Sequence, residues 1–188
     1  MHHRLLTPIS YTHAPCSLGI VLVAQSHSGI CAIFLGDGPD KLVKALHKTF
    51  PKATQKEIPE IQQVITIIEN PKTTQALALD IQGTAFQKKV WRALQEIPAG
   101  STASYTDIAD KIGSPTSCRA VAQACAANQL AVIIPCHRVV RKDGGLSGYR
   151  WGVERKRILL EKEKECGGSS EIRTRDQRIK SPLLYQLS

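Results

Sequence analysis

The stretch SYTDIADKIGSPTSCRAVAQACAA, residues 104–127, predicts two consecutive helices. Ser104 and, three residues later, Asp107 fit a helix start, where each side chain can accept a hydrogen bond from a free backbone amide. Gly113 suits the position just past a helix end, and Pro115 suits the first turn of the next helix, near residues 115–127. Two helices joined by so short a turn are a helix-turn-helix candidate, although most such pairs are simply packed helices.

The second of these helices has two different faces. Positions i, i+3, i+4 and i+7 are small or apolar and are predicted to pack inward: Cys118, Val121, Ala122 and Cys125. The opposite face combines one basic side chain with a neutral polar one and two very small ones: Arg119, Gln123, Ala126 and Ala127. A purely solvated face usually carries more charge, and small side chains let a backbone approach a flat or grooved partner closely. This pattern favours binding to a nucleic-acid duplex.

An apolar segment that leads into a cysteine follows. Residues 130–134 have the pattern of a short buried strand, which runs into Pro135-Cys136-His137-Arg138. A thiol is a useful nucleophile only as the thiolate, and positive neighbours such as His137 and Arg138 lower its pKa. For Cys136 the strand, the proline and the histidine together favour a nucleophile. Because adjacent residues on a strand point to opposite sides, His137 would reach the thiol through a bridging water. A buried structural role is the interpretation for Cys16, Cys31, Cys118 and Cys125.

The rest of the chain predicts a mixed α/β (α+β) fold. Residues 10–35 are β-rich, with strands near 18–24 and 30–35, and helices are predicted near 39–49 and 59–69. A capping box of Thr84 and Gln87 opens a further helix, and a last helix runs from 154 to about 165. We therefore predict a small β-rich domain over residues 1–82 and a mainly helical domain containing the helix-turn-helix over residues 83–165. Residues 166–188 lack core periodicity and are expected to be a disordered tail.

Charge and cysteine content narrow the functional classes. The net charge is +9, and residues 84–165 carry fourteen Lys and Arg against eight Asp and Glu. Such a segment suits a polyanion such as nucleic acid, or is simply a solvated basic surface. No apolar run is long enough for a bilayer and no signal peptide opens the chain, so we expect a cytoplasmic protein with no membrane partner. The cysteines form no CxxC pair, so we predict reduced thiols. We predict no metal, because zinc-finger spacing is absent from the candidates His2, His3, His13, Cys16 and Cys31.

The heptapeptide Ile134-Pro135-Cys136-His137-Arg138-Val139-Val140 resembles the active-site signature of the methylated-DNA–protein-cysteine methyltransferases, also called alkylguanine-DNA alkyltransferases. The resemblance extends nearly continuously over residues 83–163. Residues 16–50 also resemble the β-rich domain of the bacterial adaptive-response type, which implies a ribonuclease-H-like sheet. The regulatory, metal-binding half of those proteins has no match here, so transcriptional control is not predicted. The further matching motifs are GTAFQ at 83–87, VW at 90–91, IPAG at 97–100, SY at 104–105, RAV at 119–121, AAN at 126–128 and GYRWG at 148–152.

The resemblance implies a role for each residue around the cysteine. Cys136 would accept the alkyl group, His137 would take its proton through water, and Glu163 would orient His137. Spacing permits this last role, because Glu163 follows Leu159 and Leu160 by four and three residues, although an exposed charge within a charged run is the plainer interpretation. Asn128, which would also suit a helix end, would position the segment that leads to the cysteine.

The same resemblance implies a DNA-binding surface and a pocket for the base. Tyr105 would help to flip the nucleotide and would hydrogen-bond the departing guanine, and Arg119 would fill the space that the base leaves. Gln123, Ala126 and Ala127 would approach the DNA in the minor groove. The pocket walls would include two aromatic residues, for which ordinary packing is the alternative: Pro135, Val139, Tyr149, Arg150 and Trp151.

The implied activity is DNA repair by a single irreversible transfer. A methyl or alkyl group would pass from the O6 position of guanine, or from O4 of thymine, in double-stranded DNA to Cys136. No cofactor would be needed, because the substrate carries both the alkyl group and its leaving group. The protein would act once, as a monomer. Three alternatives fit the sequence less well. A helix-turn-helix regulator without chemistry leaves Cys136-His137 unexplained, and a thiol hydrolase that turns over repeatedly does not need Arg119 beside a small-residue face. A lesion sensor would lack the acceptor cysteine, whereas Cys136 is present.

Overall fold

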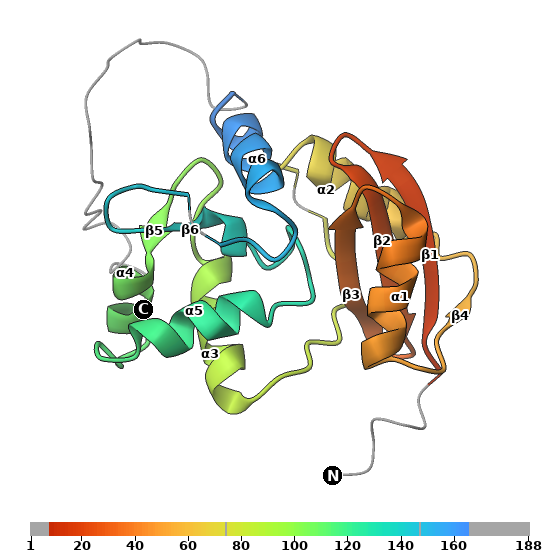
Figure 1. The fold of residues 1–188 in the computed structure, drawn as a ribbon, viewed down its shortest axis with the longest axis horizontal. Coiled ribbons are helices and arrows are strands. Elements are labelled where there is room, and N and C mark those ends of the chain that lie inside the picture. The colour runs from red at the N-terminus through yellow and green to blue at the C-terminus, as the bar shows by residue number, and fades with distance from the viewer. Residues whose placement is uncertain (1–7, 74, 147, 166–188) are drawn as a thin grey trace.

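The computed structural model describes residues 8–73, 75–146 and 148–165 (Figure 1). A four-stranded sheet forms the N-terminal region, in the order β3-β2-β1-β4. The first three strands are antiparallel neighbours, and β4 pairs parallel with β1. Its strands are β1 (Ser10–Cys16), β2 (Gly19–Ser26), β3 (Gly29–Gly36) and β4 (Thr54–Gln55).

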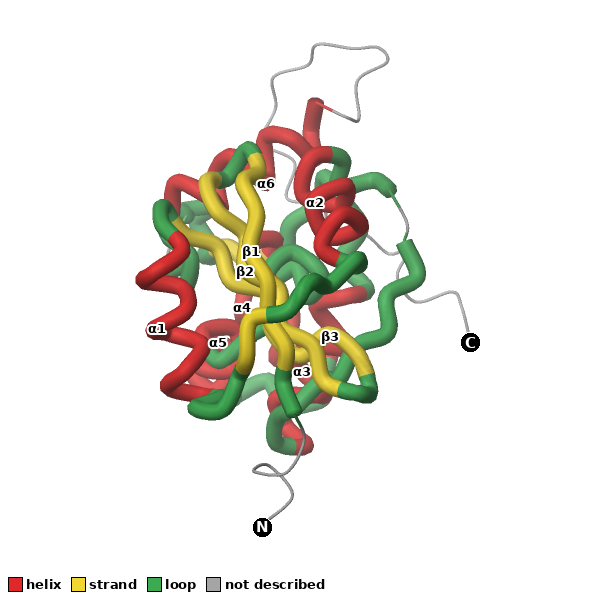
Figure 2. The backbone as a smooth tube through the Cα atoms, turned by 90° about the vertical axis from the view of Figure 1, so that its right-hand side faces the viewer, coloured by secondary structure: helices red, strands yellow, loops and turns green. Residues whose placement is uncertain are grey.

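Two helices pack on this sheet. They are α1 (Pro39–Thr49), which contacts β2 and β3, and α2 (Ile61–Glu69), which contacts β1 and β2. Figure 2 shows the sheet from the N-terminal side with α1 and α2 flanking it. The strands and helices predicted in this region are confirmed to within two residues at each end, because each carries a continuous apolar pattern that ends in glycine, proline or polar residues.

Strand β3 is buried because it is covered along its edge as well as on its faces. Every residue from Gly29 to Leu35 is buried. The backbone amide of Ile33 donates to the carbonyl of Gln129 at 2.7 Å, and that of Ile30 donates to Ala78 at 2.8 Å. In Figure 1 this strand is the one that faces the helical part of the molecule. The sheet is therefore joined to the C-terminal region through main-chain hydrogen bonds.

The C-terminal region is mainly helical. Both predicted capping boxes are present at its helix starts: Thr84 with Gln87, and Ser104 with Asp107, each exchange two hydrogen bonds of 2.9 to 3.2 Å. Each box marks a helix start because it satisfies two backbone amides that would otherwise lack a partner. The elements are α3 (Ala85–Gln95), α4 (Tyr105–Lys111), α5 (Cys118–Ala126), α6 (Val153–Glu165) and a two-stranded parallel sheet of β5 (Ala103–Ser104) and β6 (Val139–Val140).

Helix α5 differs from its prediction in its start and in its inward face. It begins at Cys118 and not near residue 115, because Ser117 donates to the carbonyl of Ser114 at 2.9 Å and closes a turn first. Its buried residues are Val121, Ala124 and Cys125, whereas Cys118 and Ala122 are half-buried. The shorter helix still packs against α4 across the turn at residues 112–117.

Helix α6 ties the two regions together. Arg155 donates from Nε to the carbonyl of Leu18 at 2.8 Å and pairs with Asp37. One turn before the helix ends, the ammonium of Lys162 lies 2.7 Å from the carboxylate of Glu69. One apolar core contains buried residues of both regions. No helix in the described part of the chain is long and apolar enough to cross a membrane. The tail predicted over residues 166–188 lies outside the described residues.

Candidate active site

Cys136 is placed by a tight turn and not by a strand. The predicted strand at residues 130–134 is wrong: only Leu130 bridges to β3, after which the chain turns and enters a single 3-10 turn, η2 (Cys136–Arg138). Val132 has a φ of 69° and is the one non-glycine residue with positive φ among the described residues. For a β-branched residue this conformation costs roughly 1–3 kcal/mol, so the surrounding contacts must impose it.

Asn128 imposes much of this turn from a fully buried position. Its Oδ1 accepts from the backbone amide of Leu130 at 2.8 Å, and its Nδ2 donates to the carbonyl of Ile134 at 3.0 Å. The same Nδ2 lies 3.2 Å from Sγ of Cys136. An N–H donor directed at sulfur stabilises the thiolate relative to the thiol. Asn128 therefore shapes the turn and favours the reactive form of the cysteine.

A buried hydrogen-bonded cluster follows Cys136 in η2. The imidazole Nε2 of His137 lies 2.7 Å from Oε1 of Glu163, and both side chains are fully buried. Arg138 donates to the same carboxylate from Nε at 3.1 and 3.2 Å and from Nη2 at 2.9 Å, and the amide of Gly100 adds a bond at 3.1 Å. Because Nε2 donates to the carboxylate, the basic lone pair of His137 is on Nδ1, which is buried and has no hydrogen-bond partner among the described residues.

The electrostatics keep both Cys136 and His137 neutral at pH 7. Burial raises the pKa of the Cys136 thiol, and the hydrogen bond from Asn128 opposes this only in part. Burial lowers the pKa of His137 even though Glu163 favours the imidazolium. Burial alone would raise the pKa of Glu163, but the hydrogen bonds from His137 and Arg138 outweigh it and lower that pKa to about 2. The site thus holds a protonated thiol together with a neutral imidazole that can act as a base.

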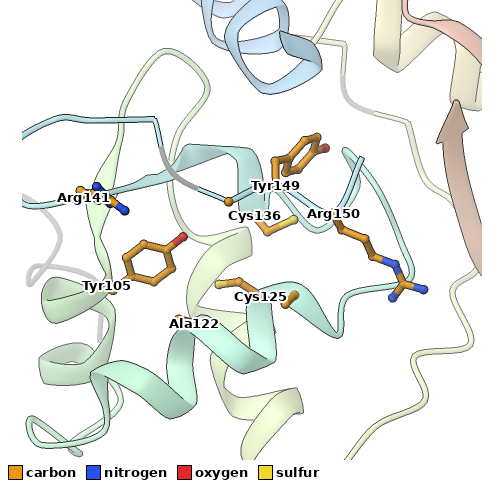
Figure 3. A pocket seen from close by; sticks show the side chains of 9 residues that line it. Tyr105, Ala122, Cys125, Cys136, Arg141, Tyr149 and Arg150 are labelled. Carbon is orange, nitrogen blue, oxygen red and sulfur yellow. The ribbon is translucent and has the colours of Figure 1, made fainter. Parts of the chain in front are cut away.

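The thiol faces a cavity of about 520 Å³. Figure 3 shows Tyr105 and Arg141 on one side of Cys136 and Arg150 on the other. The wall combines the rings of two tyrosines with alanine and glycine residues, a lining on which a planar ring can stack. Its lining consists of Tyr105, Ala122, Cys125, Ala126, Cys136, Arg141, Gly148, Tyr149 and Arg150.

Only Tyr149 and Arg150, of the five predicted pocket residues, line this cavity. The other three are not among its lining residues. Pro135 is buried within the turn, Val139 is buried in β6, and Trp151 packs on Phe34 of the sheet with ring centroids 4.9 Å apart. The segment returns to the sheet after Gly148, so Tyr149 faces the cavity and Trp151 faces β3.

The outer face of α5 carries the predicted DNA-contacting residues. Arg119, Gln123 and Ala126 are exposed, and Ala127 is half-buried. Of these, Ala126 also lines the cavity. The exposed face of α5 and the mouth of the cavity are therefore continuous.

Lys156 is a buried cation near the site that the sequence interpretation missed. Its side chain is fully buried, and Nζ donates to the carbonyl of Val139 at 2.6 Å. Burial lowers its pKa, and its charge favours the thiolate of Cys136. The signal was available, because Lys156 precedes Glu163 by seven residues and so shares its face of α6. Arg141, Cys125 and Ala122 of the cavity wall were also missed.

No group of three or more His, Cys, Asp or Glu side chains in the described ranges could hold a metal ion. His2 and His3, two of the weak zinc candidates, lie outside those ranges.

Comparison with known proteins gives consistent matches. A family model described as "6-O-methylguanine DNA methyltransferase, DNA binding domain" matches residues 85–165. The chain is 52% identical over 162 residues to the Escherichia coli "Bifunctional transcriptional activator/DNA repair enzyme Ada". This alignment covers 84% of this chain and 46% of that protein. It is 37% identical over 160 residues to the constitutive "Methylated-DNA--protein-cysteine methyltransferase" of Bacillus subtilis. This alignment covers 82% of this chain and 94% of that protein.

A solved structure agrees with these relatives. The Mycobacterium tuberculosis protein described as "OGT in complex with DNA" superposes with a TM-score of 0.73 at 33% identity, covering 84% of this chain and 94% of that one. The chain spans about half the length of several of its relatives, including the 46% of the Escherichia coli protein. The fold, the placement of Cys136 and these matches together show that the chain belongs to the methylated-DNA–protein-cysteine methyltransferase family.

Proposed function

We propose that this chain repairs DNA by moving a methyl or larger alkyl group from O6 of guanine, and from O4 of thymine, onto Sγ of Cys136. The observation that carries the proposal is a buried thiol that faces a cavity for a flat ring, next to a neutral histidine held by Glu163. The Escherichia coli relative is named as a DNA repair enzyme, and the Mycobacterium tuberculosis relative was solved with DNA. Both support the same substrate class.

The proposed reaction is one in-line displacement. The thiol proton passes through a water to Nδ1 of His137, and the sulfur electron pair attacks the alkyl carbon. The bond from that carbon to O6 breaks, and guanine leaves with the electron pair. Tyr105, at the cavity wall, donates a hydrogen bond or proton to the departing base. Glu163 keeps the imidazole in the tautomer with a free Nδ1 lone pair.

The product limits each molecule to one reaction. The S-alkyl cysteine is a thioether, and water does not readily hydrolyse its carbon–sulfur bond. The free thiol is therefore not regenerated, and the chain is a single-turnover transferase. Both the alkyl group and the leaving group come from the substrate, so the proposed reaction uses no cofactor. The thiol must remain reduced until it meets a lesion, which favours action in the reducing cytoplasm, as a monomer on DNA.

We further propose that α5 lies in the minor groove of the duplex. Its exposed Arg119 would insert where the flipped nucleotide had been stacked and would offset part of the few kcal/mol that extrusion costs. The small Ala126 and Ala127 allow close approach to a narrow groove, and Gln123 reaches the same surface. Arg119→Ala is expected to slow transfer from a duplex more than from a single strand. Equal losses on both substrates would remove the role of Arg119 in the duplex.

Mass spectrometry tests the main proposal. The protein is incubated with a duplex that contains one O6-methylguanine, and the expected result is one added methyl group per chain, located on Cys136. Cys136→Ser should add none. Cys31→Ser is the matched control, because Cys31 is a buried thiol in the sheet whose hydrogen bond to the carbonyl of Ala24 a serine can keep. Repeated turnover would instead favour a hydrolase, and binding without a mass change would favour a regulator or a sensor.

A further inference from the structure

Arg141 and Tyr105 leave the small parallel sheet at the same end. Ala103 pairs with Val139 and Ser104 with Val140, and the residues that follow these two strands are Tyr105, which begins α4, and Arg141. Both side chains line the cavity of Cys136, and Figure 3 shows them on the same side of it. A cation and a phenol are therefore fixed together at one side of the cavity.

The turn that follows holds the backbone of Arg141 in place. Its amide donates to the carbonyl of Gly145 at 3.1 Å, and its own carbonyl accepts from Gly144 at 2.9 Å. The carboxylate of Asp143 accepts from the amide of Gly145 at 2.9 Å. Gly144 has a φ of +81°, a conformation that permits so tight a turn. The backbone of Arg141 is thus held through both its amide and its carbonyl.

The guanidinium of Arg141 has no carboxylate partner in the described part of the chain, and the residue is exposed. The other arginine of the cavity wall is differently placed. Arg150 lies over the rings of Trp151 and Phe34, at 4.9 and 5.5 Å, and donates to the carbonyl of Asn128 at 3.2 Å. Arg141 is accordingly the cavity cation that is available to bind an external anion.

We infer that Arg141 binds a phosphodiester that flanks the extruded nucleotide. This inference rests on the proposed function, because a base can enter the cavity only with its two backbone phosphates close to the cavity mouth. A planar guanidinium binds phosphate oxygens through two parallel hydrogen bonds. A contact to a phosphate carries no base information, so Arg141 would stabilise the flipped state of any lesion irrespective of sequence. The alternative is that its charge adds only to diffuse attraction between the basic surface and DNA.

A double-mutant cycle, in which a protein side chain and a DNA phosphate are changed separately and together, distinguishes a direct phosphate contact from diffuse attraction. Single-turnover transfer is measured on duplexes in which one phosphate at a time, on either side of O6-methylguanine, is replaced by an uncharged methylphosphonate. Wild-type protein should lose about tenfold in rate at one of these positions, the typical effect of one charge-assisted hydrogen bond. Arg141→Ala should be slower on the unmodified duplex and insensitive at that position. Lys142→Ala removes the same charge from the neighbouring exposed residue, which does not line the cavity, and should keep the wild-type profile.

Two results would overturn the inference: an Arg141→Ala profile with the same sensitive position as the wild type, or equal losses in Arg141→Ala and Lys142→Ala. Either would mean that the charge acts at long range only. Failure of the proposed function looks different, because the wild-type protein would then transfer no methyl group from any of the duplexes.

Discussion

The sheet region, β1 to α2, and the helical region, α3 to α6, bury different kinds of side chain. Of the six buried polar or charged residues in the described chain, Ser26 belongs to the sheet region and the other five to the helical region: Ser104, Asn128, His137, Lys156 and Glu163. The sheet region is filled with valine, isoleucine, leucine and alanine. The helical region buries ionisable groups, and it does so around Cys136.

The two regions are stabilised in different ways, because an apolar core and a cluster of buried charges have different requirements. An apolar core is stabilised by removing hydrocarbon from water, at roughly 25 cal/mol per Å². Buried charges lose their hydration and are tolerated only when each is paired and hydrogen-bonded. The carboxylate of Glu163 meets this condition through His137, Arg138 and Gly100. The helical region therefore bears an electrostatic cost, and it does so around the groups that the proposed reaction would use.

Removing the buried carboxylate is expected to have the largest effect. Glu163→Ala leaves Arg138 and His137 without their partner and should lower the free energy of unfolding by about 3–5 kcal/mol, measured by urea denaturation. The pKa of this carboxyl is lowered from 4.5 to about 2 in the folded protein, so its stabilisation is present above pH 4.5. The difference from the wild type should shrink as the pH falls towards about 2. A loss that is small and independent of pH would contradict the pairing.

A deletion in the apolar core tests the other half of the comparison. Leu46 of α1 is fully buried against the sheet, and Leu46→Ala should cost about 2–5 kcal/mol of unfolding free energy. Because α1 packs on β2 and β3 and Leu46 does not line the cavity of Cys136, the single-turnover rate should stay at the wild-type value at temperatures where the variant is folded. A fall in rate that tracks the fall in stability would mean that the sheet core and the reacting groups are not separable.

The dependence of transfer on pH tests the neutral histidine. Burial lowers the pKa of His137, so the rate should keep its plateau to a lower pH than an exposed histidine would allow, and should fall about tenfold per pH unit below the pKa of His137. Glu163 favours the imidazolium, so Glu163→Gln should move the midpoint to still lower pH as well as reduce the rate. A midpoint that rises in this variant would rule out direct coupling between the two side chains.

The smallest effect is expected on the opposite face of the same helix. Glu161 is exposed and pairs with Arg157 one turn earlier, where water screens the interaction. Glu161→Ala should leave the urea midpoint and the transfer rate within error of the wild type. It is the matched control for Glu163→Ala, because both remove a glutamate from the last turns of α6.

Features that depend on residues close together in the sequence could be predicted, whereas features that depend on residues far apart could not. The capping boxes at Thr84 and Ser104 were predicted because each depends on residues three apart. The turn at Val132 was not, because its left-handed backbone is imposed by Asn128 and by pairing with β3, a strand about a hundred positions earlier. An apolar run looks the same in a strand and in such a turn. Trp151 was assigned to the pocket for a similar reason: its partner, Phe34, lies on a different region of the chain.

Helix α6 joins the sheet region to the buried cluster through two consecutive residues. Lys162 pairs with Glu69, the last residue of α2, and the next residue, Glu163, lies 2.7 Å from the imidazole of His137. The sheet region contributes no residue to the wall of the cavity, yet it contacts the helix whose carboxylate orients the histidine.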